Sequence, residues 1–563
     1  MTESAGGKLW RVIQRETPEN LRRLTWMNIL SAGATVMMLW LVQAATTAAR
    51  ENGQPGGRLL LMFLLVVALL AISNKASLIT ASRDAERLNH RLRLRLFDLV
   101  RHTDLVTLEQ VGRAALNGVL VRDIQTIGRI LPFLGVAVQQ ALMLIFLMLY
   151  LAWLSPVASV MAVGCGGLAV AVRMARDREF RRQLREAASA EADVFDGLTD
   201  MLQGFKEVRM SRPRAAALVE AIGRASGRAC RANIAAKSQW GRDHALIEVL
   251  FYTLIGLMVF GVPLFTRDFH SVVVPATVAA LFITGPISTV SFVAPMLTQA
   301  EAALSNIEAM ERRLRDAART AAGPEDAGGT PPAGLAPLPP PGRIALAAGR
   351  FSYRNELGHS VYTIGPLDVE FRAGEVAFIT GGNGAGKSTL LRLLTGLMPL
   401  ESGELLADGQ PVPAGRMQAW RDQFSAIFSD NHLSRRLYGV GPVTDADVAP
   451  LLTRLEIRDK VSVADGAFST TSLSTGQRKR LALVVARLED KPVVVLDEWA
   501  ADQDPHYRRV FYEELVPELR ALGKIVICVT HDDRWFHLAD RTYRMDEGRL
   551  QPADTAGRAE GPA

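Results

Sequence analysis

Six long apolar stretches dominate the first half of the chain. A helix needs about 20 mainly apolar residues to cross the hydrocarbon core of a bilayer. The segments that meet or approach this length are Leu24–Thr46, Leu59–Ile79, Ile130–Trp153, Pro156–Val172, Leu246–Thr266 and Ser271–Leu297. The fourth is short and rich in glycine and alanine. The pattern predicts an α-helical membrane domain over residues 1–316 with six transmembrane helices.

The basic residues between these stretches predict the orientation of the helices. Arginines and lysines gather on the cytoplasmic side of membrane proteins. They are frequent before the first stretch, after the second and after the fourth, whereas the alternate loops are short and nearly uncharged. Both termini are therefore expected to face the cytoplasm.

The two inner connections are long, roughly 50 and 70 residues. In the first of them, Leu88, Leu92, Leu94 and Leu99 lie among arginines at helical spacing. We expect the membrane helices to continue as long cytoplasmic extensions that reach a soluble domain. This layout favours a machine driven from inside the cell over a receptor that reads the outside.

A change of composition separates the two halves of the chain. Residues 317–342 are rich in proline, glycine and alanine and end in Pro339-Pro340-Pro341. Such a segment buries little apolar surface, which is typical of a linker. We assign residues 343–552 to a nucleotide-binding domain and expect 553–563 to form a disordered tail.

A phosphate-binding loop follows the apolar segment Val376–Thr380. It reads Gly381-Gly382-Asn383-Gly384-Ala385-Gly386-Lys387-Ser388-Thr389, which matches G-x-x-x-x-G-K-[ST] between a strand and a helix. Glycines let backbone N–H groups approach phosphates, and the helix N-terminus adds positive charge. Lys387 is expected to reach the β- and γ-phosphates of ATP, and the Ser388 hydroxyl to bind Mg²⁺. A chance glycine turn does not account for this context.

Two adjacent carboxylates end a second apolar segment, Pro492–Glu498. We expect Asp497 to hold Mg²⁺ and Glu498 to polarise the attacking water as a general base. Four apolar residues directly before the pair argue against a solvated acidic turn. Together with the phosphate loop, this segment predicts an α/β P-loop domain that binds and hydrolyses ATP.

The segment Leu473-Ser474-Thr475-Gly476-Gln477 resembles the LSGGQ signature of ATP-binding cassette (ABC) proteins, with Thr475 at its third position. Six spans followed by one cassette also resemble the half-transporter layout of ABC exporters. The resemblance implies that Tyr353 stacks on adenine, that Asp504 is the D-loop aspartate and that His531 is the switch histidine. It further implies a homodimer in which Ser474, Thr475, Gly476 and Gln477 of one chain act on the ATP held by the other.

Two positions differ from the usual cassette. Ser429 aligns with the glutamine that normally touches Mg²⁺, with Gln423 as a less favoured replacement, and Trp499 follows Glu498 where proline is usual.

Phe428-Ser429-Asp430, the segment 497–505 and Thr530-His531-Asp532-Asp533 resemble the cyclic-peptide exporter branch, which includes exporters of pyoverdine-type siderophore precursors and syringomycin-type lipopeptides. This resemblance implies a peptide-like or amphipathic cargo exported across a bacterial inner membrane. A lipid or multidrug exporter and an ATP-gated regulatory membrane protein remain alternatives.

Composition adds limits to this interpretation. Hydrophobic residues make up 49% and charged residues 22% of the 563 residues, which suits a chain that lies partly in membrane lipid. The formal net charge of +6 is explained by arginine-rich loops, and no basic patch is interleaved with aromatic residues as in a nucleic-acid groove. The three cysteines, Cys165, Cys230 and Cys528, lack metal-ligand spacing.

Charged residues near the spans are candidates for a cargo cavity. Lys75 lies near the end of the second span and Glu248 near the start of the fifth, with Gln43, Gln139, Gln140 and Tyr252 as weaker polar candidates. Ionisable residues at membrane depth are often functional. Both charges also lie near helix ends, where their side chains can reach water, so a purely structural role explains them as well. Pro286 and Pro295 are expected to kink the last helix.

Overall fold

The computed structural model describes residues 11, 14, 18–52, 56–265, 272–322, 338–355 and 359–553. Most of the predicted linker and tail, residues 323–337 and 554–563, lies outside the described residues. The chain forms two compact units. One comprises residues 1–97 and 114–311, and the other comprises residues 98–113 and 312–563.

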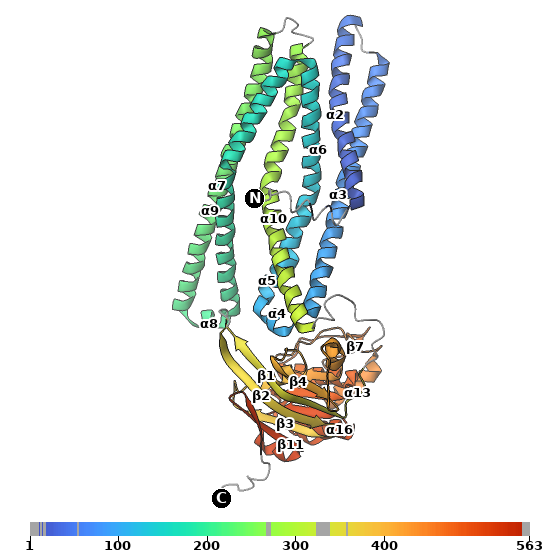
Figure 1. The fold of residues 1–563 in the computed structure, drawn as a ribbon, viewed down its shortest axis with the longest axis vertical. Coiled ribbons are helices and arrows are strands. Elements are labelled where there is room, and N and C mark those ends of the chain that lie inside the picture. The colour runs from blue at the N-terminus through green and yellow to red at the C-terminus, as the bar shows by residue number, and fades with distance from the viewer. Residues whose placement is uncertain are drawn as a thin grey trace. The chain divides into compact units, whose positions relative to one another are not determined.

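Six long helices make up most of the first unit (Figure 1). They are α2 (Pro18–Asn52), α3 (Gly57–His102), α6 (Ile124–Leu154), α7 (Pro156–Gln203), α9 (Arg212–Gly256) and α10 (Val274–Ala322). Shorter segments join or extend them: α5 (Arg113–Asn117), η1 (Gly118–Asp123), α8 (Phe205–Met210), η2 (Leu257–Gly261) and η3 (Val262–Leu264). Among the described residues, six helical segments are long and apolar enough to cross a membrane, so the predicted six-helix domain is confirmed.

The break between α6 and α7 follows from two residues. The Ser155 hydroxyl accepts a hydrogen bond from the Ala158 N–H at 3.3 Å, and Pro156 occupies the first helical position. A serine cap followed by proline is a strong helix start, because proline lacks an N–H that the first turn could not use. The two apolar stretches therefore form two helices.

The helices extend well past the length that a bilayer requires. With 46 to 49 residues, α3, α7 and α10 are each about 70 Å long at 1.5 Å per residue. A hydrocarbon core is about 30 Å thick. The long helical extensions predicted from the leucine and arginine spacing are therefore present. The last helix continues to Ala322, so the first residues of the segment predicted as linker are helical, because Ala-Ala-Arg-Thr-Ala-Ala contains good helix formers.

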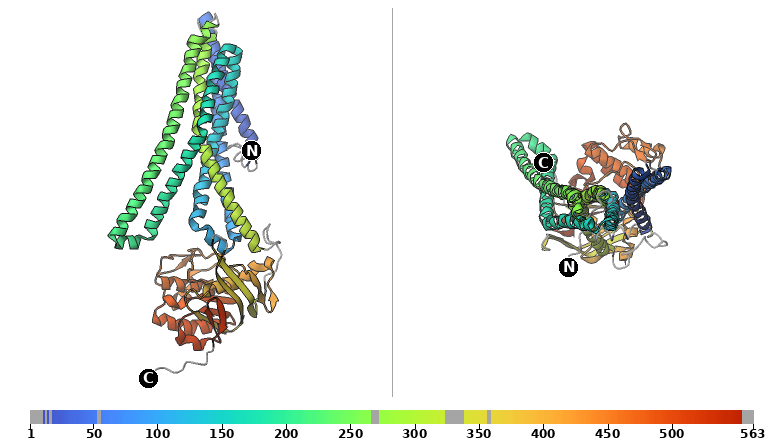
Figure 2. Two further views of the ribbon diagram at one scale, coloured as in Figure 1. Left: turned by 60° about the vertical axis from the view of Figure 1, so that its left-hand side comes forward. Right: turned by 90° about the horizontal axis from the view of Figure 1, so that it is seen from above.

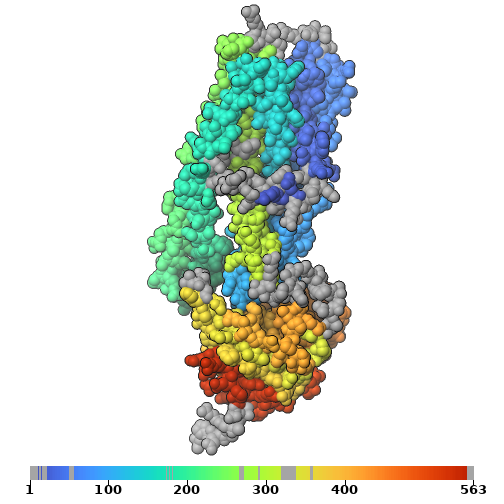
Figure 3. All heavy atoms as spheres, in the orientation of Figure 1, coloured from blue at the N-terminus to red at the C-terminus, as the bar shows by residue number. Residues whose placement is uncertain are grey.

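Helices α7 and α9 run side by side as an arm that diverges from the other helices of this unit towards α8 (Figure 2), and its side chains form a separate column at that end (Figure 3). Polar contacts link the pair. The Arg176 guanidinium lies 2.8 Å from the nearly buried Asp243 carboxylate, and Arg228 lies 2.9 Å from Asp193. Cys230 is exposed on α9. The apolar side chains at the tip, Phe205 and Met210, are 56% and 88% exposed.

A buried polar network joins α2, α3 and α6. The Ser77 hydroxyl donates to Asn28 Oδ1 at 2.7 Å, and Ser31 donates to Asn74 Oδ1 at 3.1 Å. Gln139 donates to the Ser31 hydroxyl at 2.9 Å. Polar groups in a membrane interior must find partners within the protein. The network therefore explains why polar residues are tolerated inside these spans.

The second unit contains two larger sheets, a small hairpin and the helices around them (Figure 1). The six-stranded sheet has the order β12 (Arg549–Pro552), β11 (Arg541–Asp546), β3 (Val376–Gly381), β10 (Ile525–Val529), β9 (Val493–Asp497), β6 (Phe424–Ile427). The antiparallel sheet has the order β2 (Ser360–Arg372), β1 (Arg343–Arg354), β4 (Ser402–Ala407), β5 (Gln410–Pro411). The hairpin consists of β7 (Val463–Ala464) and β8 (Ala467–Phe468).

The helical segments of this unit are α4 (Leu105–Val111), α11 (Lys387–Leu394), η5 (Ala414–Arg416), α12 (Met417–Arg421), α13 (Asp445–Arg454), α14 (Thr475–Glu489), η6 (Trp499–Asp502), α15 (Pro505–Val510), η7 (Phe511–Leu515), α16 (Val516–Ala521) and η8 (Asp533–Leu538). Its main core combines Ile344 and Phe371 of the antiparallel sheet, Ile379 of β3, and Leu390 and Leu394 of α11, each at most 1% exposed. Both sheets therefore fix α11, and the predicted α/β P-loop fold is confirmed.

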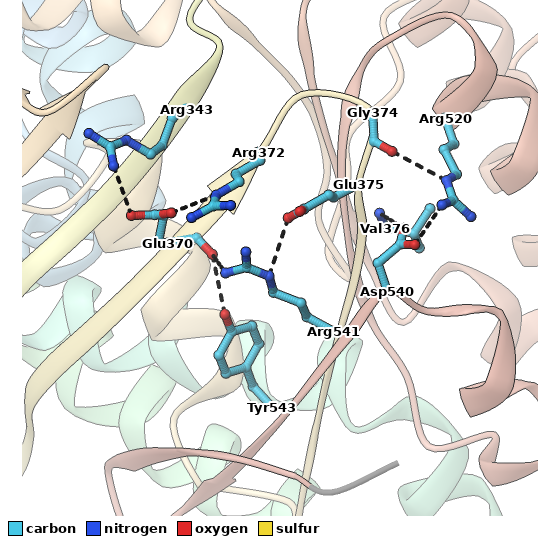
Figure 4. Close-up of polar contacts among 10 residues, drawn as sticks. All are labelled: Arg343, Glu370, Arg372, Gly374, Glu375, Val376, Arg520, Asp540, Arg541 and Tyr543. Atoms are coloured by element: carbon cyan, nitrogen blue, oxygen red, sulfur yellow. Dashed lines mark hydrogen bonds and ion pairs between the residues drawn. The ribbon is translucent and has the colours of Figure 1, made fainter. Parts of the chain in front are cut away.

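The amino end of β3 is held by a network of ion pairs and hydrogen bonds (Figure 4). Asp540 accepts from the Val376 N–H at 2.9 Å and pairs with Arg520 at 2.6 Å. Arg541 pairs with Glu375 at 3.3 Å. These contacts fix the strand at the end opposite to the phosphate loop.

Helix α4 belongs to the second unit although its residues come early in the chain. Asp104 caps it by accepting from the Thr107 N–H at 2.8 Å. Val106 packs against the core that contains α11, and Glu109 lies 3.5 Å from Arg392 of that helix. Helix α4 therefore contacts α11, the helix that follows the phosphate loop.

Candidate active site

Four parallel strands end at the same edge of the six-stranded sheet. β3 leads into the phosphate loop, β9 ends at Asp497, β10 leads to His531 and β6 leads to Ser429. Ligands of open α/β sheets bind at the carboxyl ends of the strands. The fold thus brings together residues that are far apart in the sequence.

Backbone geometry explains the glycines of the phosphate loop. Gly381 has φ 142°, and a Cβ there would lie 2.1 Å from the Met545 carbonyl oxygen of the neighbouring strand. Gly386 has φ 106°, which side-chain-bearing residues rarely adopt. Lys387, 6% exposed, donates from Nζ to the Gly381 and Gly382 carbonyl oxygens at 2.9 and 3.0 Å. Its ammonium group therefore lies within the loop, beside the exposed residues Gly382–Gly384.

Ser388 and Asp497 form a corner suited to a hard cation. The Ser388 hydroxyl donates to Asp497 Oδ2 at 2.9 Å. In the described part of the chain, Asp497 Oδ1 is buried without a hydrogen-bond partner. Burial raises the pKa of Asp497, and the nearby Glu498 carboxylate adds to the effect, while bonds from Ser388 and Ser429 oppose it. A buried carboxylate with a free oxygen beside a hydroxyl fits Mg²⁺.

The described residues contain no cluster of three or more histidine, cysteine or acidic side chains that could hold a metal by themselves. Such a cluster is not required here. Mg²⁺ in nucleotide sites is commonly bound by one or two protein ligands together with substrate phosphates and water.

Ser429, and not Gln423, lies beside this corner. The Ser429 N–H is 3.5 Å from Asp497 Oδ2. Gln423 is buried elsewhere, and its amide donates to the Leu338 and Ala419 carbonyl oxygens at 3.0 and 3.4 Å. The structure therefore places Ser429 in the position that the sequence left open between two residues.

Glu498 lies directly after the corner in a left-handed conformation, φ 50° and ψ 38°. Its Oε1 is 3.4 Å from His531 Nε2. Its carboxylate is one third exposed, so that water can reach it. The two residues predicted to be catalytic thus lie together.

Tyr353 lies at the same end of the cassette unit. Its hydroxyl and the Thr389 hydroxyl are 3.0 Å apart, and its ring packs edge-on against Phe351. Tyr362 donates to the Ala385 carbonyl oxygen of the phosphate loop at 3.0 Å. Tyr353 is therefore placed next to the last residue of the predicted phosphate-loop motif, and its stacking on adenine stays a prediction.

The signature segment caps helix α14 and faces outward. The Ser474 hydroxyl accepts from the Gln477 N–H at 3.4 Å, and Gln477 Oε1 accepts from the Ser474 N–H at 3.3 Å. Thr475 is exposed and accepts from Arg478 at 3.5 Å. Gly476 is packed so tightly that a Cβ would lie 2.6 Å from the Asp502 carbonyl oxygen. Within the described residues, hydrogen bonds of this segment reach its neighbours and Gln503 but not the phosphate loop.

Asp504 joins the signature helix to the segment after β9. Its carboxylate accepts from the Tyr507 N–H and from Arg480 Nη2, both at 3.0 Å. The Tyr507 N–H is the main cause of its lowered pKa, and the Arg480 charge acts in the same direction. Arg480 also donates to Gln503 at 2.8 Å.

The sequence did not single out Arg480 or its neighbour Lys479. Both side chains are largely buried although α14 begins at an exposed cap. Lys479 lies two residues after the signature, where a charged residue is ordinarily solvated. The apolar run that follows it, Leu481–Ala486, is the only signal in the sequence that this helix is covered.

The candidate cargo residues fall into two groups. Gln139 is bonded to Ser31, and Gln43 accepts a hydrogen bond from Tyr150, so both join neighbouring helices. Lys75 and Glu248 are exposed in the isolated chain. Tyr252 is exposed as well, at 62%, so these three side chains are available to face a cargo.

Known proteins resemble this chain along most of its length. The family model described as "ABC transporter" matches residues 364–501, and the one described as "ABC transporter transmembrane region" matches residues 24–212. The chain is 32% identical over 492 residues to "ATP-binding protein SyrD" of Pseudomonas syringae pv. syringae, covering 86% of this chain and 85% of that protein. It is 28% identical over 222 residues to the "ATP-dependent lipid A-core flippase" of Hahella chejuensis, covering 37% of each.

A similar fold is found in the solved structure described as "Structure of a bacterial Atm1-family ABC exporter with ATP bound". The TM-score is 0.75 at 16% sequence identity, and the match covers 96% of this chain and 95% of that one. At this identity the likeness concerns the fold.

Proposed function

The chain belongs to the ATP-binding cassette (ABC) transporter family, and from this premise we propose that it exports a cyclic or modified peptide, of the siderophore-precursor or lipopeptide type, by alternating access. ATP-driven export is the activity of its type of half-transporter. The observation that carries the peptide assignment is Ser429 beside Asp497, at the position where the usual cassette has glutamine. Ser429 and Trp499 are features that the chain has in common with the cyclic-peptide exporter branch.

In the proposed mechanism, Lys387 neutralises charge on the β- and γ-phosphates of ATP. Ser388 and Asp497 would hold Mg²⁺, which supplies positive charge to the phosphate oxygens when bound. Glu498 accepts a proton from the attacking water. His531 orients both Glu498 and the γ-phosphate. The 3.4 Å separation of His531 and Glu498 supports this division of roles.

A homodimer completes both ATP sites in this proposal. Among the described residues, the hydrogen bonds of Ser474 and Gly476 go to Gln477 and Gln503 and not to the phosphate loop of their own chain. A second copy would bring its signature to the nucleotide. The exposed apolar residues Phe205 and Met210 at the tip of the arm provide a further surface that a second copy would cover. We place the dimer in a bacterial inner membrane by its resemblance to the cyclic-peptide exporter branch, with both termini in the cytoplasm on the basis of the arginine distribution.

Replacing Glu498 by glutamine tests the motor. Glutamine keeps the shape of the side chain but cannot accept the proton, and general bases contribute about 10²–10⁴-fold in rate. We expect ATP turnover of the purified protein to fall by about that factor while ATP still binds and holds the dimer closed. Unchanged turnover in Glu498→Gln would show that the base is misassigned.

The cargo is tested by two experiments. Metabolite profiling of cells with and without this chain should reveal a peptide that accumulates outside only when the chain is present. The same peptide should raise the ATPase activity of the purified protein. Stimulation by a lipid or an unrelated drug instead would favour a lipid or multidrug exporter. Hydrolysis without accumulation of any solute in vesicles would favour a regulatory membrane protein.

A further inference from the structure

We propose that Lys479 is a positioning residue for Glu498. Lys479 binds the turn that carries this catalytic base to α14, the helix that begins at the signature. The proposal deepens the function given above and rests on its assignment of Glu498 as the base. Lys479 itself does not touch ATP in this proposal and acts through the backbone of Glu498.

The Lys479 side chain is only 3% exposed, and its ammonium group has two partners. Nζ donates to the Glu498 carbonyl oxygen at 2.6 Å and lies 2.7 Å from Asp502 Oδ2. Both partners belong to the segment that follows β9. A buried ammonium group is held firmly only when such partners replace its water. The lysine is therefore a fixed link between α14 and this segment.

The bond to Glu498 acts on a residue whose backbone conformation is unusual. Residues with side chains rarely adopt φ 50°. The Glu498 N–H donates to the Val529 carbonyl oxygen at 3.2 Å, and its carbonyl oxygen accepts from the Ala501 N–H at 3.3 Å as well as from Lys479. The backbone conformation determines where the carboxylate points. Of these three contacts, the shortest is the one from Lys479.

A second bond runs in the opposite direction. Trp499, the residue after Glu498, donates from Nε1 to the Lys479 carbonyl oxygen at 2.8 Å. The indole is 1% exposed and stacks on Phe511 with ring centroids 4.5 Å apart. Lys479 thus donates to the turn and accepts from it, so the helix and the turn are connected at two adjacent residues.

The same helix begins at the signature. Gly476 lies three residues before Lys479, and its carbonyl oxygen accepts from Gln503 at 3.0 Å. A movement of the start of α14 therefore reaches Glu498 through a few short contacts. If the signature closes on the partner's ATP, Lys479 links that closure to the placement of the base in its own chain.

Lys524 offers a matched comparison for a purely stabilising role. It is also a buried lysine, 9% exposed, whose Nζ lies 2.7 Å from the Asp490 carboxylate and 2.7 Å from the Lys491 carbonyl oxygen. Asp490 has φ 48°, close to that of Glu498. The two lysines have the same chemistry at opposite ends of β9, and only Lys479 contacts the base.

The test compares Lys479→Met with Lys524→Met in the full-length protein. Both changes remove an ammonium group and keep an aliphatic chain, so both should lower the thermal unfolding midpoint. We expect Lys479→Met alone to lower kcat by about tenfold or more, because small displacements of a catalytic group are costly. Its KM for ATP should stay nearly unchanged, since ground-state binding is retained. Equal kcat values for the two variants would overturn the proposal.

Trp499→Phe keeps the test decisive if Lys479→Met does not fold. Phenylalanine retains the stacking on Phe511 but lacks the N–H, so kcat should fall by a smaller factor at unchanged KM. An unchanged kcat in this variant would also overturn the proposal. Failure of the Glu498 assignment has a different signature, since turnover would then persist in Glu498→Gln, and the role of Lys479 would be rejected with it.

Discussion

At the residue scale, burial disfavours the charged form of the Asp497 carboxylate unless a cation lies beside it. Its burial raises its pKa, which means that the folded chain binds the proton more tightly than the unfolded chain does. The stabilisation from this proton is complete below the pKa of the unfolded chain, about 4, and is lost as the pH rises through the raised pKa of the folded state. A neutral side chain avoids this loss.

We therefore expect Asp497→Asn to raise the thermal unfolding midpoint of the nucleotide-free protein at neutral pH and to flatten its dependence on pH above about 4. Adding ATP and Mg²⁺ should stabilise the wild type, because the cation compensates the carboxylate, and should stabilise the variant much less. Differential scanning fluorimetry over a pH series with and without Mg²⁺ measures both effects. Equal stabilisation of the two proteins by Mg²⁺ and ATP would contradict the proposed ligand.

Gly476 is required for a steric reason. A Cβ would lie 2.6 Å from the Asp502 carbonyl oxygen, so Gly476→Ala must displace backbone next to the Lys479 contact. We expect a loss of stability of about 1–3 kcal/mol, as for other overpacked sites, together with reduced ATP turnover. Gly441→Ala is the control, since nothing lies within 4 Å of a Cβ there. Wild-type turnover in Gly476→Ala would argue against a tight contact.

The sequence predicted the site residues whose chemistry is local. The phosphate loop, the Asp497-Glu498 pair and the signature each occupy a few consecutive residues with their own backbone requirements. Ser429 and Gln423 stayed open because a hydrogen bond to Asp497 depends on how β6 and β9 pair. Lys479 was missed because its partners, Glu498 and Asp502, are about 20 residues away and only folding brings them to α14.

At the scale of elements, helix α4 is the part of the early sequence that folds with the cassette unit. Val106 packs against the core beside α11, whereas the Glu109–Arg392 pair is half exposed on the Glu109 side and contributes little. The contact therefore depends mainly on the apolar side chain.

We expect Val106→Asp to uncouple the two halves of the chain. A carboxylate at an apolar contact is costly to bury, so α4 should detach from the cassette. Vesicles containing the variant should hydrolyse ATP but accumulate no cargo. The control Glu109→Gln removes only the exposed ion pair and should transport as the wild type does. Normal transport by Val106→Asp would show that the contact of α4 with the cassette is not needed to link ATP hydrolysis to transport.

Element boundaries were predictable where the sequence carries a stop or a cap. Ser155 and Pro156 mark the boundary between α6 and α7, and this break was predicted within one residue. The end of α10 was not, because the alanines before Gly323 continue a helix that composition alone assigned to the linker. The extension of α3 beyond its apolar span was predictable, since leucines at helical spacing continue past that span.

At the scale of the whole molecule, we expect side chains of the membrane half to contact the cargo. Lys75 and Glu248 are exposed in the isolated chain, while Gln139 is buried and bonded. If the charged pair lines the cargo cavity, Lys75→Met and Glu248→Gln should each reduce peptide export from cells and leave ATP hydrolysis without cargo unchanged. Export at wild-type levels in both variants would assign the two charges to helix ends in contact with water.

The three thiols differ in exposure, so a spectroscopic label can be attached to the arm formed by α7 and α9. Cys528 is buried in β10 and its pKa is raised by that burial, so it reacts poorly, since the thiolate is the nucleophile. Cys165 is half-buried within a candidate span, and Cys230 is exposed on α9. A nitroxide attached at Cys230 in each copy of a dimer gives one distance between the two arms. Its change on adding ATP would report the opening and closing of the transporter without any engineered cysteine.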